Sequence, residues 1–234
     1  MVESLAITII EIIGTVAFAV SGAMTALEKK LDIFGVCVLG SATAIGGGVL
    51  RDIVLGNLPP ETFKNSTYAL ISIFVSILIF IFAYINKENF DRVFNKYYDL
   101  FNFLDAVGLG TFTVVGVNVA IENGFKNNAF LAIFVGTLTG VGGGVLRDLM
   151  ANKIPVVLRK RIYALAAIIG AFVYYILYIY VSHKIIAMIV SVVLTILIRV
   201  LASVYMWNLP KIYEKINEKE NKENDRIDSD IKTH

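Results

Sequence analysis

The sequence Gly46-Gly47-Gly48-Val49-Leu50-Arg51-Asp52 is repeated without change at Gly142-Gly143-Gly144-Val145-Leu146-Arg147-Asp148. Seven consecutive identities 96 residues apart indicate an internal duplication. Each copy ends a long apolar stretch, and its Arg-Asp pair puts two charges at or inside a membrane boundary. Charged side chains are energetically unfavourable at such positions and usually serve a function. The duplicated heptad therefore predicts a membrane protein with two related half-sites.

The composition excludes an ordinary soluble domain. Hydrophobic residues make up 57% of the 234 residues and charged residues only 17%, with a mean hydropathy of +0.72. The formal net charge is +2. The single cysteine, Cys37, lies in an apolar stretch and rules out a disulfide framework within the chain. These values are typical of a polytopic membrane protein.

No motif for enzymatic chemistry accompanies the duplication. The heptad lacks the Gly-Lys-Ser/Thr ending of a phosphate-binding loop. The two histidines, His183 and His234, do not stand at metal-ligand spacing with each other or with Cys37. We therefore expect neither an enzyme nor a bound metal or cofactor.

Seven apolar segments are each close to the roughly 20 residues that a helix needs to cross a bilayer. They predict an all-α integral membrane protein whose transmembrane domain covers residues 1–209. The charged segment 210–234 has almost no apolar residues, so we expect a disordered tail. The predicted spans lie near residues 4–27, 33–50, 66–86, 102–121, 128–146, 162–182 and 185–207.

The duplication extends beyond the heptad. At an offset of 94 residues, Glu11 aligns with Asp105 and Phe18 with Phe112. The first repeat therefore covers about 4–86 and the second about 102–182, while the segment 185–207 has no counterpart. Three spans are an odd number, so the second repeat must cross the membrane in the opposite direction. Such inverted repeats place binding sites of transport proteins near the midplane, at discontinuous helices.

The glycine triads are the predicted points of discontinuity. Glycine inside a helix is about 1 kcal/mol less favourable than alanine, so three in succession lower the cost of unwinding. We therefore expect the second and fifth helices to be broken there. Bare backbone carbonyls at such a break can line a cation path. The alternative is close helix packing, because small residues let membrane helices approach each other.

The distribution of basic residues predicts the orientation. Most of the 21 lysines and arginines lie in segments on the side of the C-terminus. By the positive-inside rule, the N-terminus is outside and the C-terminus is cytoplasmic. We expect a multi-pass protein of the cell membrane.

The paired heptads, the three-plus-three-plus-one layout and this orientation resemble the prokaryotic trimeric intracellular cation (TRIC) channel family. That family overlaps with small bacterial membrane proteins described as glycine transporters. The resemblance covers about residues 5–207. It implies a homotrimer in membrane lipid, with one potassium-permeable pore in each protomer lined by the second and fifth helices. Potassium would be the permeant ion, and no nucleic acid would bind.

The resemblance also assigns the permeation residues. The Arg-Asp pairs either act in gating or only anchor the helices at opposite interfaces. Neighbours on a helix point about 100° apart, so we expect an exchange in which Arg51 pairs with Asp148 and Arg147 with Asp52. The assigned residues are Gly46, Gly47, Gly48, Arg51 and Asp52 with their counterparts Gly142, Gly143, Gly144, Arg147 and Asp148.

Glu11 and Asp105 are secondary candidates near the starts of the first and fourth spans. As acids they favour cations at a constriction, or they cap broken helices or lie at the membrane interface. Three classes of function remain at this point. The first is a monovalent cation channel, chiefly for potassium. The second is a carrier that moves a small amino acid such as glycine by alternating access. The third, a scaffold without transport, does not explain duplicated charges inside the membrane.

Overall fold

The computed structural model describes residues 2–87, 90–159, 162–181 and 183–205. The charged tail 210–234 lies outside the described residues. Within them, seven helices are long and apolar enough to cross a membrane. This confirms the predicted all-α membrane fold. The helices are α1 (Val2–Glu28), α2 (Ile33–Leu55), α4 (Thr67–Ile85), α5 (Phe90–Glu122), α6 (Ala129–Met150), α8 (Ile162–Tyr180) and α9 (Lys184–Val204), with short α3 (Glu61–Lys64), η2 (Phe125–Asn127) and α7 (Val156–Arg159) between them.

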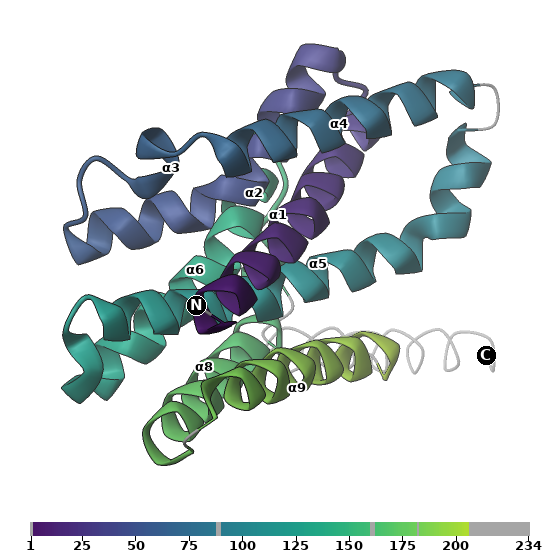
Figure 1. The fold of residues 1–234 in the computed structure, drawn as a ribbon. Coiled ribbons are helices and arrows are strands. Elements are labelled where there is room, and N and C mark those ends of the chain that lie inside the picture. The colour runs from purple at the N-terminus through teal and green to yellow at the C-terminus, as the bar shows by residue number, and fades with distance from the viewer. Residues whose placement is uncertain (1, 88–89, 160–161, 182, 206–234) are drawn as a thin grey trace, which may run out of the picture.

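The two repeats pack in the same way. In the first repeat α4 packs against α1 and α2, and in the second α8 packs against α5 and α6. The repeats meet through the contacts of α1 with α5 and of α2 with α6. As a result α4 and α8 lie on opposite sides of the bundle (Figure 1). Helix α9 packs against α8 and α5 and belongs to neither repeat.

Two helices continue beyond the ends that hydropathy predicts. The predicted spans end at residues 50 and 146, whereas α2 continues to Leu55 and α6 to Met150. The Arg-Asp pairs therefore lie inside the helices. Hydropathy counts both charges as unfavourable, but these side chains are buried and paired with each other. Helix α2 ends at Gly56, whose φ of 75° is left-handed and whose N–H donates to the carbonyl of Asp52.

The expected breaks at the glycine triads are absent. Helices α2 and α6 are helical at every residue through Gly46–Gly48 and Gly142–Gly144. The weak helix propensity of glycine is offset here by contact between the two helices. A Cβ on Gly47 would overlap the carbonyl oxygen of Thr139, and a Cβ on Gly143 would overlap that of Thr43. The triads thus mark a close crossing of α2 and α6.

The glycines of one triad have different surroundings. The first two, Gly46 and Gly47 in α2, face α6, since a Cβ on Gly46 would meet Leu146. The third, Gly48, points away from the crossing, and the nearest atom to its added Cβ is Nη2 of Arg51 at 3.8 Å. In α6 the added Cβ of Gly144 is also 3.8 Å from Nη2 of its own arginine, Arg147, but it is only 2.9 Å from the hydroxyl of Tyr163. Close packing therefore explains the first two positions of each triad and also Gly144, whereas Gly48 is left for a different role.

Candidate functional site

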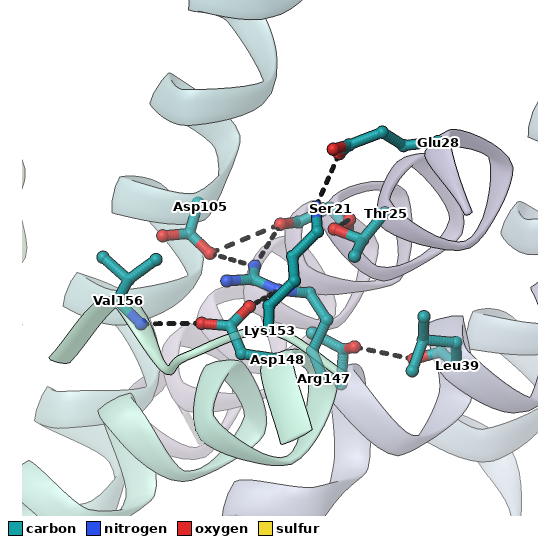
Figure 2. Close-up of polar contacts among 10 residues, drawn as sticks. Ser21, Thr25, Glu28, Leu39, Asp105, Arg147, Asp148, Lys153 and Val156 are labelled. Atoms are coloured by element: carbon teal, nitrogen blue, oxygen red, sulfur yellow. Dashed lines mark hydrogen bonds and ion pairs between the residues drawn. The ribbon is translucent and has the colours of Figure 1, made fainter. Parts of the chain in front are cut away.

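Arg147 joins three helices near the end of α6. Its side chain is only 6% exposed. Nε donates to Oδ1 of Asp148 at 2.9 Å, while Nη1 donates to Oδ1 of Asp105 at 2.5 Å and to Oγ of Ser21 at 2.6 Å. Figure 2 shows the guanidinium between Asp105 from α5 and Ser21 from α1. A buried guanidinium with several charge-assisted hydrogen bonds is held firmly in place.

Asp148 links this cluster to the following loop. Its second oxygen, Oδ2, accepts a hydrogen bond of 2.8 Å from the backbone N–H of Val156, the first residue of α7 (Figure 2). Both oxygens of the carboxylate are therefore used. The short helix α7 is positioned by the same residue that neutralises Arg147.

The first repeat builds the same arrangement at Arg51. Nε of Arg51 donates to Oδ1 of Asp52 at 2.8 Å. Oδ2 of Asp52 accepts from the backbone N–H of Glu61, the first residue of α3, at 2.9 Å. Glu11 accepts a hydrogen bond from the hydroxyl of Tyr68 and lines the same cavity as Arg51. We call Glu11, Arg51, Asp52 and Tyr68 the Arg51 cluster.

The matching set in the second repeat is Asp105, Arg147, Asp148 and Tyr163, which we call the Arg147 cluster. Tyr163 is 2% exposed and lies next to Gly144, whose added Cβ would be 2.9 Å from the tyrosine hydroxyl. Tyr68 and Tyr163 are both the second residue of their helices, α4 and α8.

The predicted exchange of partners across the two repeats is wrong. Each arginine pairs with the aspartate next to it in the chain. The two clusters are separated along α1, where Glu11 and Ser21 are about 15 Å apart at 1.5 Å per residue. The argument from helix geometry considered only the directions of the Cβ atoms. An arginine side chain is long enough to bend toward its neighbour, whereas exchanged pairs would have to reach past the crossing of α2 and α6.

Each cluster lines a cavity. The Arg147 cavity has a volume of about 370 Å³ and is lined by Asp105, Arg147 and Asp148 together with Arg199 from α9. The Arg51 cavity is smaller, about 60 Å³, and is lined by Glu11, Gly48 and Arg51 with Tyr68 and Phe112. The third glycine of the first triad thus faces a cavity, in agreement with its position away from the crossing.

Two phenylalanines lie between the clusters. Phe18 on α1 and Phe112 on α5 have ring centroids 5.3 Å apart and are 1% and 9% exposed. Phe18 comes between Glu11 and Ser21 on α1, and an added Cβ on Gly143 would be 3.3 Å from its ring. The ring pair therefore forms an apolar layer beside the crossing of α2 and α6.

The structure brings both secondary candidates into the clusters. Asp105 is 5% exposed and pairs directly with Arg147, so it is not an interfacial cap. Glu11 lines the Arg51 cavity. Tyr68, Tyr163, Ser21 and Arg199 were not predicted from the sequence. A signal for the tyrosines exists, because Tyr-Ala-Leu occurs at 68–70 and again at 163–165.

Comparison with known proteins shows which family this chain resembles. A family model described as "Glycine transporter" matches residues 8–84 and 102–179. The UPF0126 inner membrane protein YadS of Escherichia coli K12 is 37% identical over 202 residues, which cover 86% of this chain and 93% of YadS.

Solved structures of cation channels share the fold. The TRIC trimeric intracellular cation channel orthologue from Rhodobacter sphaeroides is 33% identical, with a TM-score of 0.76 over 86% of this chain and 98% of that one. A prokaryotic TRIC channel crystallised in 0.5 M KCl is 36% identical, with a TM-score of 0.77 over 88% and 100%. The chain is thus a multi-pass membrane protein that belongs to the family described as glycine transporters and has the fold of the prokaryotic TRIC cation channels.

Proposed function

We propose that this protein is a potassium-permeable cation channel that works as a homotrimer with one path through each protomer. The observation that carries this proposal is the likeness to TRIC cation channel structures, at 33% and 36% identity over 86% and 88% of the chain. We further propose that the Arg51 end of the bundle faces the outside and the Arg147 end faces the cytoplasm, as the basic residues indicate.

In the proposed mechanism, cations pass between the Arg51 and Arg147 cavities. The acids of each cluster attract a cation, and each arginine is held beside its aspartate. Gly48 gives the path room near Arg51, and Gly144 lets Tyr163 pack close to α6 beside Arg147. Gly46, Gly47, Gly142 and Gly143 set the crossing that brings the two repeats together. The Phe18–Phe112 pair is the narrow apolar element between the cavities.

A carrier of a small amino acid is the second candidate. It is favoured by the family description and by the Arg147 cavity, which contains both charge signs. An amino acid carboxylate would bind Arg199, and its ammonium would bind the acids Asp105 and Asp148. The structural likeness to channels makes this the weaker reading.

The two functions are separated by flux measurements on purified protein in liposomes. Under a potassium gradient, a channel produces potassium flux that follows the membrane potential and does not saturate at low millimolar concentrations of the transported ion. A carrier produces saturable counterflow of labelled glycine. Electrically driven potassium flux without glycine counterflow supports the channel. Glycine counterflow without independent potassium flux overturns it.

Removal of one ring of the apolar layer should increase conduction. Phe112→Ala replaces a buried ring that lines the Arg51 cavity with a methyl group, so water and ions enter the narrow region more easily. We expect a several-fold rise in potassium flux into liposomes at equal amounts of folded protein. Phe34→Ala, at a phenylalanine that is 74% exposed, is the matched control and should leave the flux unchanged. An unchanged or lower flux in Phe112→Ala argues against this layer as the constriction.

A further inference from the structure

We infer that Arg199 makes the permeation path electrically asymmetric, so that cation current is larger in one direction than in the other. This inference rests on the proposed channel function. It assigns a role to α9, the helix that has no counterpart in the duplication.

Arg199 is a buried cation that has no carboxylate partner among the described residues. Its residue is 5% exposed, and its guanidinium lies 5.0 Å from the centre of the Tyr163 ring. Nε has no hydrogen-bond partner, and in the part of the chain that the structure describes no carboxylate lies at ion-pair distance from this guanidinium. The aromatic ring attracts the guanidinium but does not neutralise it, so Arg199 keeps its full positive charge at the cavity that it lines. Such a residue points to a function that needs the positive charge.

The two clusters would carry equal charge without Arg199. The Arg51 cluster combines Arg51 with the two acids Glu11 and Asp52, which leaves one excess negative charge. The Arg147 cluster combines Arg147 with Asp105 and Asp148, which again leaves one excess negative charge. This equality follows directly from the duplication.

Arg199 removes this equality, because it lines the Arg147 cavity and brings the charge there to zero. Among the described residues, the other charged side chains that line the two cavities are paired: Lys153 with Glu28 at 2.7 Å, and Glu61 with Lys64 at 3.6 Å. Among the described residues of the Arg51 cavity, no basic side chain takes the place of Arg199. The seventh helix therefore gives two cavities that already differ in size a different net charge as well.

Unequal cavities give unequal rates of cation entry. A cleft with excess negative charge and low-dielectric walls raises the local cation concentration. Cations should therefore enter more readily from the Arg51 end than from the Arg147 end. At equal and opposite voltages, the current that enters from the Arg51 end should be the larger one.

The test is single-channel recording in planar bilayers with the same potassium chloride concentration on both sides. Currents are recorded at about +100 and −100 mV. In about 0.1 M salt we expect the two wild-type currents to differ about twofold or more. The ratio should approach one in about 1 M salt, where the screening length falls from roughly 10 Å to 3 Å. This comparison needs only the wild-type protein.

Substitutions then assign the asymmetry to Arg199. Arg199→Met should raise the smaller of the two currents and bring the ratio close to one in low salt. Arg199→Lys keeps the charge and should keep the ratio. The double substitution Lys153→Met with Glu28→Gln removes an ion pair from the same cavity without changing its net charge, so it serves as the control and should change the ratio little.

Each result decides between the proposals. Symmetric wild-type currents, or an asymmetry that Arg199→Met leaves in place, overturn the role of Arg199 and leave the channel standing. Loss of asymmetry in both Arg199→Met and Arg199→Lys shows a structural role and also overturns it. If the wild-type protein passes no potassium current at all, the proposed function fails, and this inference fails with it.

Discussion

Gly47→Ala strongly lowers the stability of the protein, whereas the same substitution at the next residue, Gly48, is neutral or slightly stabilising. A methyl group on Gly47 would overlap the backbone carbonyl of Thr139, and neither of two crossing helices can easily move away. Overpacking of a tight interior costs about 1–3 kcal/mol or more, and backbone contact puts this site at the upper end. On Gly48 the methyl group meets nothing closer than 3.8 Å and gains up to about 1 kcal/mol of helix propensity.

The measurement compares the two variants in detergent. Each protein is heated in steps, and the fraction that remains in the folded peak of gel filtration is recorded. The midpoint should fall by many degrees for Gly47→Ala and stay level or rise for Gly48→Ala. Gly143→Ala should behave like Gly47→Ala, because Gly143 meets the carbonyl of Thr43 in the same way. Equal losses at Gly47 and Gly48 would show that the crossing is not the limiting contact.

Arg147→Met has the second large effect, a loss of about 3–5 kcal/mol of stability. The substitution leaves Asp105 and Asp148 buried at 5% and 4% exposure without their shared cation. Lys153→Met also removes a basic residue at this end of the bundle, but its pair with Glu28 is partly exposed. Exposed ion pairs contribute about 0–1 kcal/mol, so this control should lose little.

A second substitution tests the cause of this loss. Asp105→Asn removes one of the two unpaired charges and should restore part of the stability of Arg147→Met, although alone it destabilises the protein. The same heating assay gives the stability changes of Arg147→Met, of Asp105→Asn and of the double variant. The coupling between the two sites is calculated from these three changes. Additive losses would mean that the pair of Arg147 and Asp105 contributes little to folding.

The duplication and the spans could be predicted from the sequence because each follows from a local requirement. A helix that crosses a bilayer needs about 20 apolar residues, and a charged residue within such a segment can be read directly from the sequence. The matched positions of Glu11 and Asp105 and of Phe18 and Phe112 follow from the alignment of the two halves. The opposite orientation of the two repeats follows from the odd number of spans in each repeat. The seven spans needed no knowledge of contacts between helices.

The ends of α2 and α6 could not be predicted in this way. Hydropathy counts the charges of Arg51 and Asp52 separately, so the predicted span ends before them. In the folded protein each arginine and its neighbouring aspartate are buried as a pair, and the helix continues to Leu55. The cost of the charges depends on their pairing, which hydropathy does not include.

The sequence alone therefore determined the number of membrane-spanning helices, their inverted duplication and the residues that carry charge in the membrane. The tertiary structure decided which of these residues meet. Gly47 and Gly48 are identical neighbours, but a rotation of about 100° per residue puts one against α6 and the other toward a cavity. Arg199 belongs to no repeat, and only the packing of α9 on α5 and α8 brings it to the Arg147 cavity. Contacts between helices depend on their relative rotation and side-chain reach, and neither is encoded in a local pattern.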